Sequence, residues 1–202
     1  NSTLTWDISS SLGVGDVGLN GGRIRITQDA SLTDNYVFNT TGTVDITTKK
    51  LSLSPQESTW NGNIYWIGNG ATINLQNNVY LDGIWTLSGN ISIEGNDYLI
   101  DLSPTGSIIL ERGAQITLKN ISIFNMSRKN RITCLDDRCS IILSKTDLLM
   151  SGNYLWDKGG IYIYFESDIG IIDGLDAVYT FSYASTQTCT VDTFANFIIK
   201  EG

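Results

Sequence analysis

The sequence predicts an all-β chain folded as a right-handed parallel β-helix, a solenoid of about seven coils with capping strands at both ends. Three observations predict this fold. Apolar and polar residues alternate at period two, a small residue opens an apolar pair about every 20 residues, and asparagines fall at the breaks between segments. No segment has the apolar stripe of an amphipathic helix.

The segment from Gly106 to Ile123, GSIILERGAQITLKNISI, shows the pattern most clearly. A glycine precedes the alternating pair Ile108 and Leu110, and a polar turn follows. The alternation resumes at Ile116 and Leu118, breaks at Lys119-Asn120, and resumes again to Ile123. This order predicts three short strands separated by turns.

The same opening recurs along the chain, with large apolar residues two and four positions after a small residue. The seven openings are Gly22 (Ile24, Ile26), Gly42 (Val44, Ile46), Gly62 (Ile64, Trp66), Gly83 (Trp85, Leu87), Gly106 (Ile108, Leu110), Cys139 (Ile141, Leu143) and Gly159 (Ile161, Ile163). Their spacings by subtraction are 20, 20, 21, 23, 33 and 20 residues. We interpret the long interval as an insertion at residues 127–138.

Asparagines mark a second set of turns. Asn35, Asn77, Asn96, Asn120 and Asn153 each precede an apolar segment. Asparagine tolerates the left-handed backbone region, and stacked asparagines can hydrogen-bond from coil to coil. The alternative fold is an antiparallel β-sandwich, which also has short strands at regular spacing. A sandwich does not require one register of glycine, apolar pair and asparagine through seven units.

The predicted domain organisation has three parts. Residues 1–20 form an N-terminal strand or cap, residues 21–174 the β-helix, and residues 175–202 a C-terminal cap. Terminal repeats of solenoids usually depart from the consensus.

The composition limits the partners and the compartment. The formal net charge is −8, from 13 basic and 21 acidic residues, which argues against nucleic acid and anionic membranes as partners. No apolar run is long enough to span a bilayer. The chain begins at Asn1 without methionine or signal sequence, so we expect a processed chain that is secreted, extracellular or on the cell surface.

Three cysteines bear on this expectation. Cys134 and Cys139 flank the turn Leu-Asp-Asp-Arg, and we expect them to form a disulfide in an oxidising compartment. The alternatives are that both are thiols in stacked strands, or that Cys189 is the true partner of one of them.

Several motifs carry a family resemblance. WTLSGNISIEGN (residues 85–96) and ITLKNISI (residues 116–123) resemble right-handed parallel β-helix proteins in general. RITCLDD (131–137), SGNYLWDKG (151–159) and YTFSYASTQTCTV (179–191) resemble uncharacterised secreted repeat proteins of Babela-type bacteria, the Dependentiae. The resemblance covers residues 40–192 and implies a fold and a secreted setting, with no established activity. Cys139 departs from that pattern.

The sequence offers little for catalysis. It contains no histidine, which excludes catalytic triads that use histidine and the usual histidine-containing zinc sites. No cofactor is expected. Polysaccharide lyases and glycosidases need carboxylates that converge. The candidates are Asp136 and Asp137 beside Arg138, which we interpret as a solvated turn, and the scattered set Glu94, Asp101 and Glu111. We therefore expect that the protein is not an enzyme.

Two functions remain, and the first is structural. We expect subunits to assemble end to end into an extracellular fibre or surface layer, with the protein itself as its main partner. The expected assembly residues are Leu4, Trp6 and Ile8 near the start, and Phe194, Phe197 and Ile199 near the end. These segments have strand character and lie outside the repeat, so their free edges need a partner.

The alternative is a carbohydrate-binding or adhesin module that contacts surface glycans. Trp60, Tyr65, Tyr80 and Tyr162 could stack on sugars if they share an outer face. Trp66, Trp85 and Trp156 fall at positions expected to pack in the core.

Overall fold

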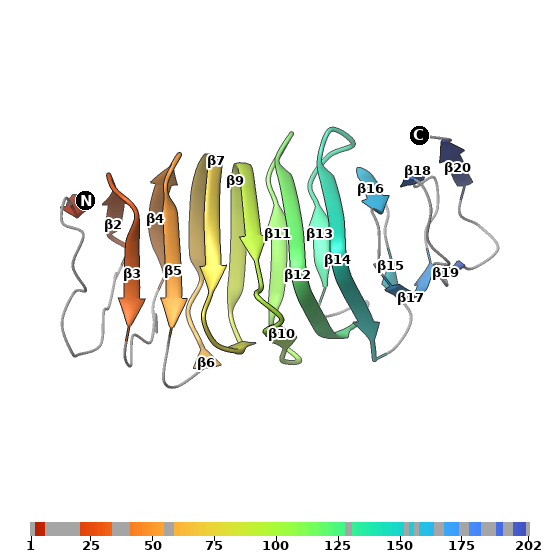
Figure 1. The fold of residues 1–202 in the computed structure, drawn as a ribbon, viewed down its shortest axis with the longest axis horizontal. Coiled ribbons are helices and arrows are strands. Elements are labelled where there is room, and N and C mark those ends of the chain that lie inside the picture. The colour runs from red at the N-terminus through yellow and green to blue at the C-terminus, as the bar shows by residue number, and fades with distance from the viewer. Residues whose placement is uncertain are drawn as a thin grey trace.

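The chain folds as an all-β parallel β-solenoid. Its structure is a computed structural model that describes residues 3–6, 21–33, 41–54, 59–127, 131–151, 154–155, 158–163, 168–173, 178–182, 189–191 and 196–200. These residues contain 20 strands and no helix, and the strands stack side by side along one axis (Figure 1). Among them, no helix is long and apolar enough to cross a membrane.

The strands form three stacks, which we call faces A, B and C. Face A contains β1 (Thr3–Trp6), β2 (Arg23–Ile26), β4 (Gly42–Thr47), the first halves of β7 (Ile64–Leu75) and β9 (Ile84–Glu94), β11 (Ser107–Leu110) and β13 (Ile132–Cys134). Face B contains β3 (Ala30–Thr33), β5 (Lys50–Ser54), the second halves of β7 and β9, the first halves of β12 (Gln115–Met126) and β14 (Ser140–Met150), β16 (Gly160–Ile163), β18 (Val178–Ser182) and β20 (Asn196–Lys200).

Face C contains β6 (Thr59–Trp60), β8 (Val79–Leu81), β10 (Leu99–Leu102), the second halves of β12 and β14, β17 (Asp168–Asp173) and β19 (Cys189–Val191). The short β15 (Tyr154–Leu155) pairs with the end of β17. Four strands therefore continue around a corner: β7 and β9 from face A to face B, β12 and β14 from face B to face C.

Every pairing among the described strands is parallel, which excludes the antiparallel sandwich. Ile64 stands opposite Trp85, and Trp66 opposite Leu87. Between Gly42 and Gly62 the register is shifted by two residues, because Val44 stands opposite Trp66 instead of Ile64. The predicted register of glycine and apolar pairs is correct between Gly22 and Gly42 and from Gly62 to Gly106. It places equivalent residues of successive turns directly above one another.

The register of the later units differs from the sequence expectation. Ile108 pairs with Ile132, and Ile141 pairs with Ile116 on a different face. The openings at Cys139 and Gly159 therefore belong to face B, and the segment expected as an insertion at residues 127–138 contributes β13 to face A. Both faces begin with a small residue before alternating apolar residues, so the pattern alone did not distinguish them. Seven coils in one register are not confirmed, because five of the seven openings lie on face A and two on face B.

The core is a continuous column of aliphatic side chains with one aromatic cluster. Trp60, Trp66 and Trp85 are almost fully buried, with ring centroids 5.3 to 6.3 Å apart. The indole N–H groups of Trp66 and Trp85 have no hydrogen-bond acceptor among the described residues, a cost of roughly 1–3 kcal/mol each that the ring packing must offset. Trp60 was expected outside as a sugar-stacking residue and is instead part of this core.

Glycine opens turns because the neighbouring coil leaves no room for a side chain. A Cβ atom on Gly83 would lie 2.1 Å from the carbonyl oxygen of Gly62, and one on Gly106 would lie 1.9 Å from that of Leu81. At the other corners asparagine takes the left-handed conformation, with φ of 51° at Asn96 and 48° at Asn120.

A polar ladder joins three successive turns through Asn96, one of the expected turn asparagines, and through Asn74 and Ser52, which were not among them. The Asn96 Nδ2 atom donates to Asn74 Oδ1 at 3.0 Å, and Asn74 Nδ2 donates to Ser52 Oγ at 3.3 Å. Asn96 also donates to the carbonyl of Leu75 at 2.7 Å. These bonds satisfy the nearly buried Asn74 and fix the vertical alignment of the coils.

Candidate functional site

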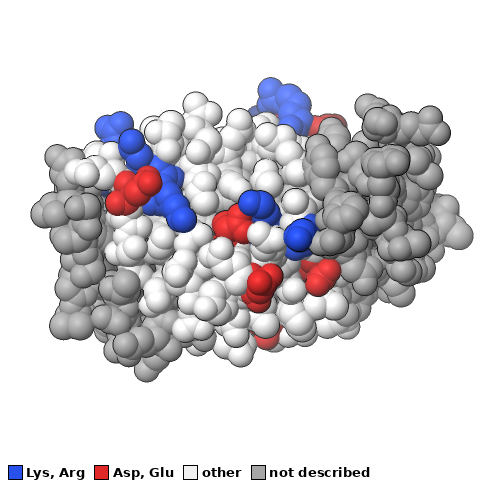
Figure 2. All heavy atoms as spheres, viewed as in Figure 1, with Lys and Arg blue, Asp and Glu red and all other residues white. Residues whose placement is uncertain are grey.

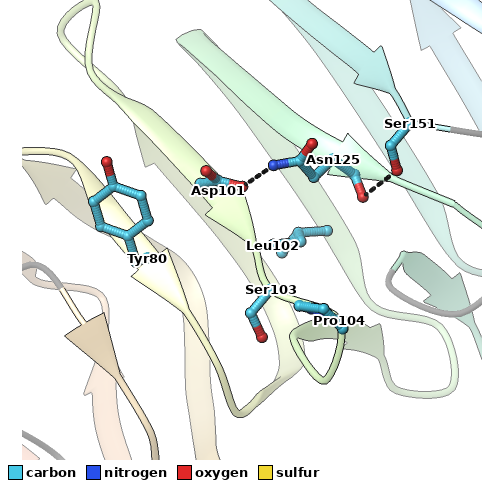
Figure 3. A pocket seen from close by; sticks show the side chains of 7 residues that line it. All are labelled: Tyr80, Asp101, Leu102, Ser103, Pro104, Asn125 and Ser151. Atoms are coloured by element: carbon cyan, nitrogen blue, oxygen red, sulfur yellow. Dashed lines mark hydrogen bonds between the residues drawn. The ribbon is translucent and has the colours of Figure 1, made fainter.

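The candidate site is a groove on face C, with a volume of about 440 Å³. It is lined by Tyr80, Asp101, Leu102, Ser103, Pro104, Asn125 and Ser151 (Figure 3). These residues come from β8, β10, the turn after β10, the end of β12 and the position just after β14. The groove therefore crosses successive turns of the solenoid.

Strand alternation sets the direction of the two principal side chains. Val79 and Leu81 are buried, so Tyr80 between them points outward and is 46% exposed. Ile100 and Leu102 are buried on β10, so Asp101 points outward in the same way. Asp101 pairs with Tyr80 in the parallel register, which places the carboxylate beside the phenol ring on the neighbouring strand.

A chain of hydrogen bonds forms one wall of the groove. Asn125 Nδ2 donates to Asp101 Oδ1 at 2.5 Å, and Ser151 Oγ donates to the Asn125 carbonyl at 3.1 Å (Figure 3). Asn125 has a φ of 61°, a conformation that asparagine tolerates better than most residues. The three residues thus form a fixed polar edge across three turns.

The turn that carries Pro104 is held from the coil before it. The carboxylate of Asp82 accepts hydrogen bonds from Ser103 and Thr105, the latter at 2.5 Å. These two bonds, that from Ser103 first, lower the pKa of Asp82 below its usual value. Asp82 therefore holds in place the turn that carries Ser103 and Pro104, two residues that line the groove.

The electrostatics of the groove are simple. None of its seven lining residues is basic, and Asp101 is the one carboxylate among them. Elsewhere charges form small mixed groups, and Figure 2 shows that uncharged side chains cover most of the described surface in that view. A ligand of this groove would meet an aromatic ring, amide and hydroxyl groups, and one negative charge.

The Asp136 carboxylate stabilises its own turn and ties it to the neighbouring coil. Its carboxylate accepts from Arg138 Nη2 at 2.7 Å, and from the backbone nitrogens of Gly113 and Arg138 at 3.1 Å each. The Arg138 side-chain bond is the main cause that holds the pKa of Asp136 well below its usual range. Asp137 is exposed beside it.

The scattered carboxylates have separate partners. Glu94 lies 3.0 Å from Lys119 Nζ and accepts from Asn120 Nδ2 at 2.6 Å. Glu111 accepts from the hydroxyl of Tyr65 on face A, whereas Asp101 lies in the groove on face C. No group of three histidine, cysteine, aspartate or glutamate side chains in the described part of the chain is arranged to hold a metal ion.

Of the proposed sugar-stacking aromatics whose side chains are described, Tyr80 alone lines the groove. Tyr65 is half-buried, and burial first and the bond to Glu111 second raise its pKa. The side chains of Tyr162 and Trp156 lie outside the described residues. Asn125 and Ser151 were not predicted, because their approach to Asp101 depends on how the second halves of β12 and β14 stack.

Cys134 and Cys139 are both buried and are not bonded to each other in this structure, and the disulfide expected in an oxidising compartment stays a prediction. The Cys139 thiol donates to the Glu111 carbonyl at 2.9 Å and lies 3.4 Å from Asp136 Oδ1. Cys139 is a corner residue, since its backbone carbonyl accepts from Gly160 at 3.0 Å. Cys189 is on β19, and its side chain is not among those described.

The predicted assembly segments lie at the two ends of the stack. Leu4 and Trp6 are on β1, opposite Ile24 and Ile26, and Phe197 and Ile199 are on β20. Both strands continue the parallel ladder of their faces, and their part in assembly stays a prediction. Ile8 and Phe194 lie outside the described residues.

The fold and groove define a parallel β-solenoid with an aromatic and polar groove on one side face. No family model, curated protein or solved structure matches the chain.

Proposed function

We propose that the protein is a secreted structural subunit that assembles end to end into an extracellular fibre or surface layer. The observation that supports this most is the position of β1 and β20 at opposite ends of one parallel stack (Figure 1). Among the described residues, β1 pairs with β2 alone and β20 with β18 alone. Their outer edges carry backbone donors and acceptors suited to another strand.

Geometry constrains how two subunits would join. β1 lies on face A and β20 on face B, so direct pairing requires the next subunit to be rotated by one face about the solenoid axis. Such a contact joins two different surfaces and does not close on itself, so repeated contacts produce a filament. Trp6 and Phe197 are the proposed anchors, because aromatic side chains bury the largest areas.

Deletion of residues 1–12 tests this proposal, since it removes β1. We expect the full chain to form filaments visible by electron microscopy, and the shortened chain to sediment as a folded monomer with β-type circular dichroism. Trp6→Lys should weaken assembly in the same direction, because a charge on an edge strand opposes pairing.

Tyr80→Ala is the matched control, because it changes a side face and should leave the filaments intact. Assembly of the shortened chain as before, or a full chain that stays monomeric at high concentration, would refute the proposal.

The proposal also covers the hand of the solenoid and the role of its terminal strands. We propose that the solenoid is right-handed, since parallel crossover connections are right-handed in nearly all cases. The terminal strands would then serve as caps in the free subunit and as contacts in the filament. The extracellular setting and the likeness to secreted repeat proteins of Dependentiae stay proposals from the sequence alone.

We further propose that the protein has no polysaccharide-cleaving activity. The Asp136 carboxylate is bonded to Arg138 within its turn, and Glu94, Asp101 and Glu111 each have a different partner, so these carboxylates do not converge. Incubation with polygalacturonate should release neither reducing ends nor unsaturated products. Release that is lost in Asp137→Asn would show that an enzymatic site exists.

A further inference from the structure

We propose that the groove on face C binds a neutral, hydroxyl-rich saccharide chain. This inference is independent of end-to-end assembly, because the groove lies on a side face and includes no residue of β1 or β20. It rests on three observations: an outward aromatic ring, an open carboxylate oxygen beside it, and a fixed polar edge.

Tyr80 supplies the stacking surface. It is among the most exposed large hydrophobic side chains in the described part of the chain, although both neighbours on its strand are buried. Its ring projects beside Asp101 in Figure 3, and its hydroxyl makes no hydrogen bond to a described residue. The apolar C–H face of a pyranose ring matches such an aromatic face, and the phenol oxygen can still bond a sugar hydroxyl.

Asp101 supplies the directional contact. One carboxylate oxygen accepts from Asn125, whereas the second has no hydrogen-bond partner among the described residues. The bond to Asn125 fixes the side-chain rotamer, so little conformational entropy is lost when a ligand binds. A fixed carboxylate oxygen beside an aromatic ring can accept hydrogen bonds from sugar hydroxyls at the edge of a stacked ring.

The same features exclude other ligand classes. A phosphate, sulfate or uronate group would meet Asp101 without a basic lining residue to neutralise it. The volume of about 440 Å³ falls in the range of small-molecule sites. Because the lining residues come from successive turns, the groove follows the solenoid axis, which suits a linear chain.

Affinity electrophoresis of the full chain tests this inference, with gels containing soluble β-glucan, galactomannan or, as the anionic comparison, polygalacturonate. We expect retardation by at least one of the two neutral polymers and none by polygalacturonate. Tyr80→Ala should weaken the apparent affinity by about tenfold or more, as expected for truncating a central aromatic contact. Tyr80→Phe should retain most of the affinity because it keeps the ring.

Asp101→Ala tests the carboxylate, and Leu149→Ala is the control, since Leu149 is an exposed residue of β14 that is not among the lining residues. Asp101→Ala should weaken retardation and Leu149→Ala should not. No retardation by either neutral polymer, or equal retardation of Tyr80→Ala and the unaltered chain, would overturn the inference. A changed oligomeric state of Tyr80→Ala without polymer would instead assign the groove to a contact between copies, and would also overturn it.

Discussion

Ile108→Asp should prevent the chain from folding. Ile108 is fully buried on β11, opposite Trp85 on one side and Ile132 on the other. A carboxylate there would stand in the apolar column without a partner, and burying it costs several kcal/mol, a large part of the roughly 5–15 kcal/mol that stabilises a typical domain. Circular dichroism and one-dimensional proton NMR should show an unfolded or aggregated chain.

The neighbouring residue gives a matched control. Ile109 points away from the core on the same strand, opposite Thr86 and Thr133. Ile109→Asp carries the same change in charge and volume one position along and should fold, with a loss of about 1 kcal/mol or less. If Ile108→Asp keeps native-like spectra, or if both variants fail equally, the alternation assigned to β11 is incorrect.

Gly106→Ala should cost about 3 kcal/mol, more than alanine substitution at any open glycine of the solenoid. The added Cβ atom would lie 1.9 Å from the Leu81 carbonyl oxygen, a backbone atom that cannot rotate away. The same oxygen accepts a hydrogen bond from the backbone nitrogen of Ser103 at 3.0 Å. Separating the coils would therefore also weaken the position of Ser103, which lines the groove. Urea unfolding with an unchanged m-value would measure the loss.

Gly113→Ala separates this steric effect from backbone strain. Gly113 has a φ of 71° but nothing within 4 Å of a Cβ atom, so alanine there should cost only about 1–2 kcal/mol, from the left-handed conformation. Equal losses for the two variants would mean that contact between coils is not the reason for glycine at position 106.

Local periodicity determined the fold class and most of the core. Alternation of apolar and polar residues identified Ile108, Leu110, Ile116 and Leu118 as buried, and all four are. Alternation depends only on neighbours in the chain, since successive side chains of a strand point to opposite faces. Asn96 and Asn120 were placed correctly at corners because their residue type tolerates positive φ.

Only the tertiary structure decided which face each unit joins. The units that open at Gly106 and Cys139 have the same local pattern, yet the first belongs to face A and the second to face B. That choice depends on which strand already lies beneath, a contact about 25 residues distant in sequence for typical solenoid repeats. The misplaced insertion at residues 127–138 and the count of seven coils both follow from this ambiguity.

The groove on face C also depends partly on local sequence pattern and partly on how the coils stack. The sequence marked Tyr80 as an aromatic that could face outward and Asp101 as one of several scattered carboxylates. It did not place Trp60 in the core or bring Asn125 and Ser151 to Asp101. Those positions follow from the stacking of β8, β10, β12 and β14, because residues on adjacent turns meet only after the register between coils is fixed.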